Sequence, residues 1–114
     1  MLHYTIYENK NSDQWVTFVH GAGGSSSIWY KQIKAYKENF NILLLDLRGH
    51  GKSKNPVNKF IKRYTFEYLT RDVIEVLDHL KIEKSHFVGI SLGTIIIRSF
   101  RLKWESRTRV ESKD

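Results

Sequence analysis

The chain has 114 residues, of which 40% are hydrophobic and 27% charged, a composition typical of one globular domain and not of a disordered chain. It contains no cysteine, which excludes disulfides and thiolate metal sites. The first residues lack the apolar core of a signal peptide, and no stretch reaches the roughly 18 apolar residues of a membrane span. We therefore expect a soluble, cytoplasmic protein.

The formal net charge is +7, and much of this excess lies between Arg48 and Arg71, where Glu67 is the single acidic residue. A basic cluster with interleaved aromatic side chains can bind nucleic acid through phosphate contacts and stacking. The preferred interpretation is a solvated loop followed by a helix whose aromatic residues point inward, because no nucleic-acid module signature accompanies the charge. We expect no nucleic-acid partner.

Short apolar segments alternate with amphipathic ones along the first half of the chain. "LHYTIYE" predicts a weak strand, and "WVTFVHG" predicts a strand that Gly21 ends. "GGSSSIWYKQIKAYKENF" opens with serines suited to cap a helix and then spaces Ile28 or Trp29, Ile33 and Tyr36 at helical intervals. "FNILLLDL" is a continuous apolar run, which indicates a strand buried on both faces.

After a loop that contains Pro56, Thr65 is the predicted cap of a helix whose apolar residues recur every three or four positions. "SHFVGI" predicts another strand, and "GTIIIRSF" predicts the start of a buried helix. This order predicts an α/β fold over residues 1–100, with a mostly parallel sheet of three to four strands and helices on both faces. Residues 101–114 carry five basic and three acidic residues without an apolar period, and they predict a disordered tail.

The segment "GISLG" fits the pattern G-x-S-x-G at Gly89–Gly93. A strand ends just before Ser91 and a helix begins just after it, which is the setting of a nucleophile elbow. Gly89 and Gly93 allow a sharp turn that holds Ser91 in a strained conformation. The alternative is an ordinary glycine-rich turn with an idle serine, and the strand–turn–helix context favours the elbow.

Two further glycine-rich segments follow predicted strands. In "FVHGAGGSS", free backbone N–H groups can bind an anion, either a phosphate or a developing oxyanion, or the loop is a flexible connection without a ligand. "DLRGHGKS" ends like a phosphate-binding loop at Gly51-Lys52-Ser53, but that motif requires a glycine where Asp46 stands. No helix follows this segment either, so we reject the phosphate-loop interpretation.

The three motifs together resemble the α/β-hydrolase superfamily, and in particular small bacterial serine esterases and lactonases, over roughly residues 15–100. The resemblance implies that Ser91 is the nucleophile that forms an acyl-enzyme with an ester or lactone. It also implies that the backbone N–H groups of Ala22 and Leu92 form the oxyanion hole. No cofactor and no metal is implied. The other motif residues are expected to shape the site: His20, Gly21, Gly23, Asp46, Arg48, Gly49, His50, Gly51, Gly89 and Gly93.

The chain departs from this family after the nucleophile. The family's triad acid and histidine follow the serine, whereas no histidine follows Ser91 here and the only later acids are Glu105, Glu111 and Asp114. We therefore expect the N-terminal portion of a hydrolase domain, truncated after the helix that follows Ser91, with little or no activity alone. The exposed edge of the strand before Ser91 is expected to favour self-association or aggregation.

Three alternatives remain for the function. Another chain can dock on the exposed sheet edge and supply the acid and the histidine. His20 or His50 can act as a substitute base, since both follow strands at the end of the sheet where Ser91 lies, whereas His86 begins its strand and is expected at the opposite end. The third alternative is a non-catalytic binding module that uses the basic segment from Arg48 to Arg71 to bind nucleic acid or anionic lipid.

Overall fold

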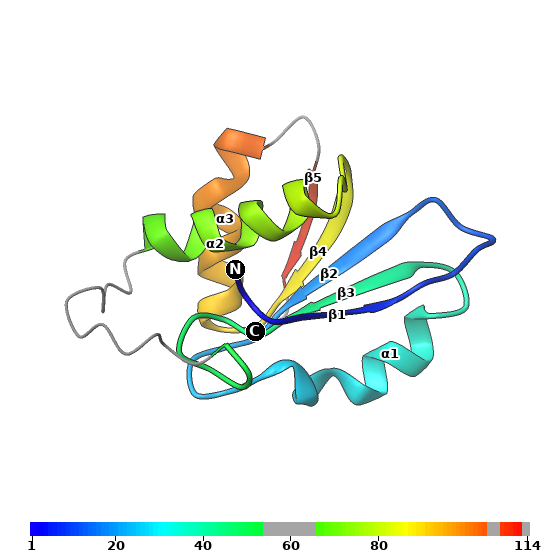
Figure 1. Cartoon of the computed structure of the whole chain (residues 1–114), viewed down its shortest axis with the longest axis horizontal. Coiled ribbons are helices and arrows are strands. Elements are labelled where there is room, and N and C mark those ends of the chain that lie inside the picture. Colours follow the sequence, from blue (N-terminus) through cyan, green and yellow to red (C-terminus); the bar gives the residue numbers. More distant parts are fainter. Residues whose placement is uncertain (54–65, 105–107, 113–114) are drawn as a thin grey trace.

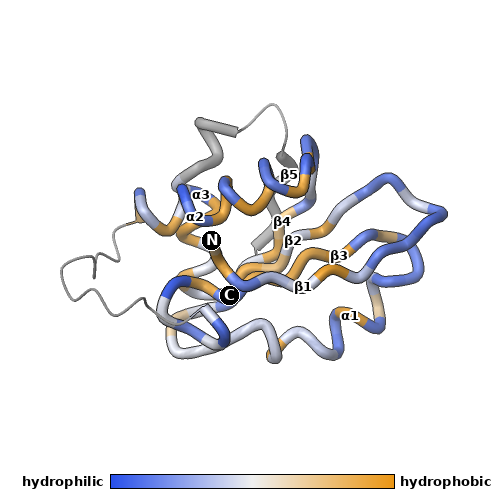
Figure 2. Tube along the Cα trace, viewed as in Figure 1, coloured by the Kyte–Doolittle hydropathy of each residue, from blue (hydrophilic) through white to orange (hydrophobic). Residues whose placement is uncertain are grey.

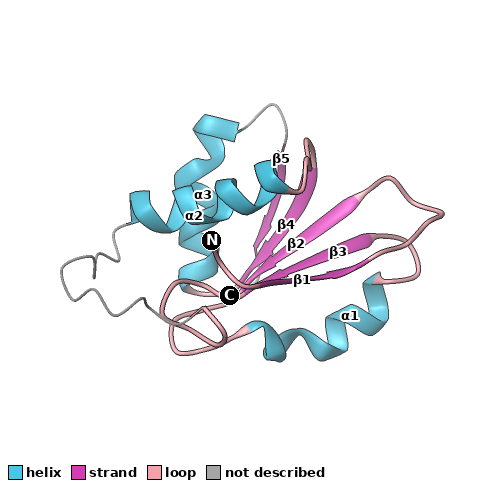
Figure 3. Ribbon diagram, in the orientation of Figure 1, coloured by secondary structure: helices cyan, strands magenta, loops and turns pink. Residues whose placement is uncertain are grey.

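The computed structural model describes residues 1–53, 66–104 and 108–112 (Figure 1). Its strands are β1 (Tyr4–Tyr7), β2 (Trp15–Val19), β3 (Asn41–Leu45), β4 (Ser85–Gly89) and β5 (Thr108–Ser112). Its helices are the 3-10 turn η1 (Ser26–Trp29), α1 (Tyr30–Tyr36), α2 (Phe66–His79) and α3 (Leu92–Trp104). The predicted alternation of strands and helices is confirmed (Figure 3). Pro56 and the predicted cap Thr65 lie outside the described residues.

The five strands form one sheet in the order β1-β3-β2-β4-β5. β1 runs antiparallel to β3, with Tyr4 opposite Leu45, and all other neighbouring pairs are parallel. The mostly parallel α/β fold is thus confirmed, with one strand more than the three to four that we predicted. Because β1 is antiparallel, it begins at the end of the sheet where the carboxyl ends of the parallel strands lie. The N-terminal residues therefore lie beside the loops that follow β2 and β3.

The additional strand lies in residues 101–114, where we predicted a disordered tail. This prediction is wrong for most of the segment, because α3 continues to Trp104 and β5 pairs with β4. Thr108 lies opposite Ser85 and Ser112 opposite Gly89. The sequence did not reveal β5 because backbone hydrogen bonds to a neighbouring strand hold an edge strand without any apolar alternation. β5 therefore covers the edge of β4 that we expected to be exposed.

Helices cover both faces of the sheet, α2 and α3 on one and α1 on the other (Figure 1). β3 shows the reason, since its buried side chains alternate between the faces with the period of two of a strand. Leu43 and Leu45 join the core under α2 and α3, whereas Ile42 and Leu44 join the core with Trp29 of η1. The predicted double burial of this strand is confirmed, and Figure 2 shows the apolar strands between the two helical layers.

The helix faces also follow the predicted spacing. α2 buries Leu69, Val73, Val76 and Leu77 at intervals of three and four residues, which gives the apolar face that the sequence predicted. In η1, Trp29 is the buried member of the predicted pair, and Ile28 is exposed. No helix within the described ranges is long and apolar enough to cross a membrane.

Candidate active site

All three motifs of the sequence meet at the carboxyl ends of the parallel strands. β2, β3 and β4 are parallel neighbours, so the segments that follow them emerge at the same edge. These segments are residues 20–25 after β2, residues 46–53 after β3, and the turn Gly89–Leu92 after β4. Figure 1 shows the three connections gathered where the strands converge.

The turn after β4 holds Ser91 in a left-handed backbone conformation, with φ at 53°. A residue with a Cβ reaches this region only at a cost of about 1–2 kcal/mol. The turn is closed by the Gly93 N–H, which donates to the Ile90 carbonyl at 2.9 Å, and α3 begins at Leu92. Ser91 itself is exposed. The sharp, strained strand-to-helix turn that the sequence predicted is present here.

The glycines on either side of Ser91 are required by close backbone approach. A Cβ on Gly93 would lie 2.0 Å from the Val19 carbonyl oxygen of β2. A Cβ on Gly89 would lie 2.7 Å from the carbonyl carbon of Gly93. The start of α3 is therefore pressed against the ends of β2 and β4, and this contact is what forces the chain through the tight turn at Ser91.

The loop after β2 lies directly beside this turn. A Cβ built on Gly21 would be 3.2 Å from the Ile90 carbonyl oxygen and 3.3 Å from the Ser91 Cβ. The Gly24 N–H donates to the Gly21 carbonyl at 3.1 Å, and Gly23 has φ at 78°, the pattern of a type II turn. Ala22, the second residue of this turn, is exposed. The structure therefore brings Gly21 next to Ser91, and the turn that Gly21 begins contains the other two predicted residues, Ala22 and Gly23.

His20, which precedes this turn, is fully buried. Its Nδ1 lies 2.7 Å from the Gly21 carbonyl, and its Nε2 accepts the Leu47 N–H at 2.9 Å. Because a carbonyl only accepts, Nδ1 carries the proton and the ring is neutral. Burial also lowers the pKa of His20, since it disfavours the charged imidazolium. His20 thus connects the loops after β2 and β3.

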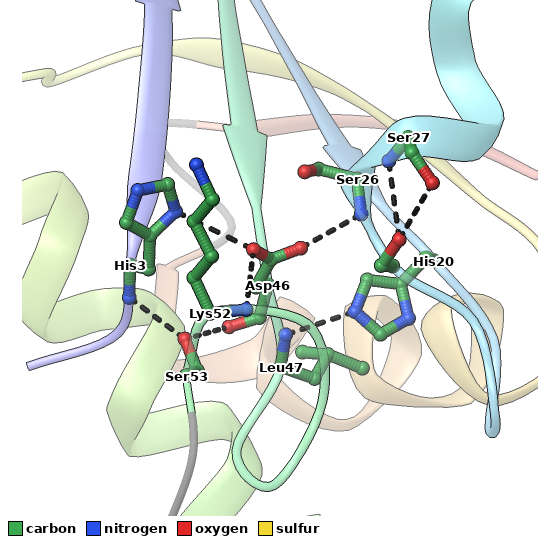
Figure 4. Close-up of polar contacts among 9 residues, drawn as sticks. His3, His20, Ser26, Ser27, Asp46, Leu47, Lys52 and Ser53 are labelled. Atoms are coloured by element: carbon green, nitrogen blue, oxygen red, sulfur yellow. Dashed lines mark hydrogen bonds and ion pairs between the residues drawn. The ribbon is translucent and has the colours of Figure 1, made fainter.

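The carboxylate of Asp46 is the centre of the loop after β3 (Figure 4). It is 3% exposed, and it accepts the Ser26 N–H at 2.8 Å and the Lys52 N–H at 3.1 Å. Burial alone raises the pKa of this carboxyl, but the two backbone hydrogen bonds and the Ser26 hydroxyl outweigh it and hold the pKa below its usual value. The Gly51 backbone packs closely against this carboxylate, because a Cβ on Gly51 would lie 2.6 Å from the Asp46 Cγ.

This arrangement explains why the loop is not a phosphate-binding loop. The N–H of Lys52 points at the Asp46 carboxylate, and the hydroxyl of Ser53 donates to the Asp46 main-chain carbonyl at 2.6 Å. The protein's own carboxylate occupies the place where the loop directs its donors. An anion here would meet that negative charge.

Three residues of this cluster were missed by the sequence reasoning: His3, Ser26 and Ser53. The His3 N–H donates to the Ser53 hydroxyl at 2.7 Å, 50 positions away, and its Nδ1 lies 3.4 Å from the Asp46 carboxylate. Figure 4 shows these side chains converging from three segments. No sequence spacing signals a contact of this range, because antiparallel pairing of β1 with β3 creates it.

Arg48 fastens the same loop to α2. Its Nε and Nη2 each donate to a different carboxylate oxygen of Asp72 at 2.8 Å, and its guanidinium lies over the Tyr68 ring at 5.6 Å. Arg71 pairs with Glu67 at 3.0 Å. Arg48 and Arg71 of the basic segment are therefore paired with carboxylates of α2, and the alternative of a basic binding module stays a prediction. Lys54, Lys59, Lys62 and Arg63 lie outside the described residues.

The remaining predicted residues, Gly49 and His50, complete the loop. Gly49 has φ at 76°, a conformation that suits glycine. His50 reaches across to the neighbouring loop, where its Nε2 accepts the Gly23 N–H at 2.9 Å. Within the described residues, no group of three or more histidine, aspartate or glutamate side chains could hold a metal ion.

The fold and this edge define a class of protein: an α/β domain with a strained serine turn after a central parallel strand. The sequence profile of the alpha/beta hydrolase fold family matches residues 14–106. The chain therefore belongs to the alpha/beta hydrolase fold family.

Particular relatives agree with this assignment. The chain is 37% identical over 78 residues to 3-oxoadipate enol-lactonase 1 of Acinetobacter baylyi, a match that covers 68% of this chain and 27% of that protein. It is 28% identical over 109 residues to the putative carbamate hydrolase RutD of the same organism, covering 94% of this chain and 40% of the relative. The solved enol-lactonase from Burkholderia xenovorans superposes with a TM-score of 0.84 and 33% identity, covering 96% of this chain and 41% of that one.

These matches share one feature, which is that the chain covers only part of each relative. It spans between 27% and 40% of the length of the two curated relatives above. The shared part is the N-terminal portion of the hydrolase fold. The 114 residues of this chain thus contain the serine turn, the glycine-rich loop after β2 and the Asp46 loop.

Proposed function

We propose that Ser91 is the nucleophile of a serine hydrolase that cleaves an ester or lactone through an acyl-enzyme. The observation that carries the proposal is the left-handed φ of 53° at a non-glycine residue between β4 and α3. Strain of this kind is concentrated at functional sites, where the surrounding structure maintains it. Ser91 is also exposed, so a substrate carbonyl can reach it.

The neighbouring backbone supports an oxyanion hole made by Leu92 and Ala22. Leu92 is the first residue of α3, and the first N–H groups of a helix have no partner inside it. Ala22 lies in the turn that begins at Gly21, and a Cβ on Gly21 would lie 3.3 Å from the Ser91 Cβ. Two such donors stabilise the charge that develops on the carbonyl oxygen, and loss of one typically lowers the rate about 100- to 1000-fold.

The reaction follows from this geometry. The Ser91 Oγ attacks the carbonyl carbon while a base takes its proton, and the carbonyl electrons move to the oxygen held by the two N–H groups. The tetrahedral intermediate collapses, the ester carbon–oxygen bond breaks, and the alkoxide takes a proton. In a lactone this alkoxide stays attached to the acyl chain as the ring opens. Water then attacks the acyl-enzyme and regenerates the Ser91 hydroxyl.

We infer that the base comes from outside these 114 residues, because each of the five histidines either has both ring nitrogens in use or lies away from Ser91. His20 and His50 use both ring nitrogens on the two loops. His86 lies near the start of β4 and contacts Gln14. The His3 Nδ1 lies 3.4 Å from the Asp46 carboxylate, and the His79 ring contacts Tyr4 of β1. β1 is three strands from β4, a separation of about 14 Å.

This inference removes His20 and His50 as substitute bases and predicts that the isolated chain has little activity. Serine hydrolases that lose triad members retain only residual catalysis, about 10³- to 10⁴-fold over water. The substrate class is supported by the names of two relatives, an enol-lactonase and a putative carbamate hydrolase.

The proposal can be tested with a fluorophosphonate probe and imidazole as an added base. The Ser91 oxygen attacks phosphorus, the phosphorus–fluorine bond breaks, fluoride leaves, and imidazole accepts the serine proton. We expect intact-mass measurements to show one adduct that forms slowly alone and faster as imidazole rises. Ser91→Ala should remove the adduct, and Ser27→Ala, at another exposed serine, should leave it unchanged. Equal labelling of the parent chain and Ser91→Ala would contradict the proposal.

A further inference from the structure

The loops after β2 and β3 hold each other through a reciprocal pair of histidines. His20, from the first loop, accepts the Leu47 N–H of the second at 2.9 Å. His50, from the second loop, accepts the Gly23 N–H of the first at 2.9 Å. Both bonds span 27 residues, and the two rings lie together with their centroids 5.1 Å apart. We call this arrangement the histidine clasp.

The clasp requires both rings to be neutral in the same tautomer. The Nδ1 atoms of His20 and His50 lie 2.7 Å from the Gly21 carbonyl and 2.9 Å from the Arg48 carbonyl. Each carbonyl can only accept, so each Nδ1 carries the hydrogen and each Nε2 is left with a lone pair. That lone pair is what receives the N–H of the opposite loop. A variant keeps the second half of the clasp only if it places an acceptor where the His50 Nε2 lies.

The two halves of the clasp act on different parts of the site. The His20 half lies in the buried interior, whereas the His50 half reaches the exposed turn of residues 21–24. The Gly23 N–H belongs to the peptide unit between Ala22 and Gly23. Gly23 is at φ 78°, and a Cβ there would meet nothing within 4 Å, so the space beside its Cα is open.

A peptide unit at the centre of a glycine-rich turn can rotate between the type II and type I arrangements, since glycine tolerates both signs of φ. The bond from the Gly23 N–H to His50 opposes that rotation. This rotation changes ψ of Ala22 and φ of Gly23 but leaves φ of Ala22 at about −60° in both turn types, so it does not itself redirect the Ala22 N–H. The bond acts on that group in another way, because it ties the whole turn to the loop after β3. The clasp therefore restrains the position of the turn that carries the Ala22 N–H.

From this geometry we propose that His50 is a positioning residue that holds the turn, and with it the Ala22 N–H, in place for the oxyanion of the reaction. The proposal rests on the proposed function, because it takes Ala22 as an oxyanion donor. His50 is itself well supported: Arg48, two residues before it, makes a two-bond contact with Asp72 of α2. The backbone just after the turn is held too, since the Asp46 carboxylate accepts the Ser26 N–H. The chain of contacts runs from α2 through the Asp46 loop to the turn.

The test compares His50→Leu, which removes the acceptor, with His50→Gln, whose side-chain carbonyl can replace the Nε2 lone pair. His79→Gln is the control for loss of a histidine away from the site, because His79 is exposed at the end of α2. In the ¹⁵N-labelled chain, amide hydrogen exchange of Gly23 reports the clasp directly. We expect exchange about 2- to 10-fold faster in His50→Leu, with His50→Gln and His79→Gln close to the parent chain.

The second readout is the imidazole-assisted fluorophosphonate labelling of Ser91, which forms a tetrahedral phosphonate with an oxygen at the oxyanion position. We expect His50→Leu to slow labelling about 10- to 100-fold, as a misplaced donor does, and His50→Gln to restore most of the rate. Circular dichroism shows whether each variant is folded. If His50→Leu fails to fold, two other measurements decide whether the bond between the Gly23 N–H and His50 exists. One is Gly23 exchange in His50→Gln. The other is the histidine ¹⁵N shifts of the parent chain, which show whether the His50 Nε2 is unprotonated.

The outcomes separate the two proposals. Unchanged Gly23 exchange in a folded His50→Leu chain, or a protonated His50 Nε2 in the parent chain, would overturn the clasp whatever Ser91 does. Faster Gly23 exchange with unchanged labelling would overturn the positioning role while leaving Ser91 as the nucleophile. Absence of Ser91 labelling in the parent chain, with Gly23 protected, would overturn the proposed function and with it the catalytic meaning of the clasp.

Discussion

The serine turn after β4 and the Asp46 loop after β3 lie at the same edge of the sheet but are held in opposite ways. The serine turn depends on absent side chains, because Gly89 and Gly93 let backbones approach to distances that no Cβ permits. The Asp46 loop depends on a side chain that is present, a buried carboxylate that gathers backbone N–H groups from two segments. Close steric packing thus maintains the serine turn, and hydrogen bonds to a buried charge maintain the Asp46 loop. Different substitutions should therefore destabilise the two regions.

The largest effect is expected at the serine turn from Gly93→Ala. The new Cβ would lie 2.0 Å from the Val19 carbonyl oxygen, so α3 would have to move away from β2. We expect a loss of about 4 kcal/mol or more of unfolding free energy, in the range of severe backbone clashes. Urea unfolding of Gly93→Ala and of the parent chain measures this loss of unfolding free energy. Gly24→Ala, whose Cβ would be 3.3 Å from the nearest atom, is the control, and an equal loss in both would contradict the steric explanation.

The corresponding change in the Asp46 loop is Asp46→Asn, which keeps the shape but removes the charge. The amide weakens one hydrogen bond and directs an NH₂ group at one of the two backbone N–H donors, Ser26 or Lys52. We expect a loss of about 2–3 kcal/mol, the range for hydrogen bonds to charged groups. Asp13→Asn, at an exposed aspartate, should change the stability by less than about 0.5 kcal/mol. A neutral effect of Asp46→Asn would show that the loop is held by packing.

Acid should distinguish the two regions as well, because the serine turn of residues 89–92 contains no titratable side chain, whereas the Asp46 loop and the histidine clasp joined to it contain Asp46 and His20. The folded pKa of His20 is lowered from 6.5, so the unfolded chain binds the proton more readily. The stability is then constant above pH 6.5 and falls as the pH decreases toward the folded pKa. The Asp46 contribution is present above 3.8, its unfolded value, and is lost as the pH falls through the lower folded pKa.

Urea unfolding between pH 8 and 5 measures the His20 effect. His20→Gln should flatten the decline, whereas His79→Gln, at an exposed position, should leave it steep. An identical pH dependence in the parent chain and His20→Gln would show that His20 is not the group responsible.

The smallest expected effect is a gain in stability from Ser91→Gly. Glycine relieves the left-handed strain of about 1–2 kcal/mol, and its greater freedom in the unfolded chain offsets about half of that gain. We expect a net stabilisation of about 0.5–1 kcal/mol, with loss of fluorophosphonate labelling, as is typical where function depends on strain. Ser91→Ala is the matched variant, since it loses labelling without relieving φ. Destabilisation by Ser91→Gly would argue against stored strain.

Much of the fold was readable from local pattern. The continuous apolar run of β3 predicted burial on both faces, and the three-and-four spacing of α2 predicted its buried face, because side-chain periodicity reflects which surface meets the core. β5 could not be read in this way. Its residues have no apolar alternation, and the strand is defined by pairing with the edge of β4.

The candidate site shows the same division. The sequence by itself determined the chemistry available: a serine between two glycines after a strand, a glycine-rich loop and an aspartate followed by glycines, each a local pattern with a local meaning. Only the tertiary structure decided how these segments act on one another. The contacts of His20 with Leu47, of His50 with Gly23 and of His3 with Asp46 join segments 27 or more positions apart. Contacts of this range arise from strand order, which brings distant loops to one edge, and strand order is a property of the whole sheet.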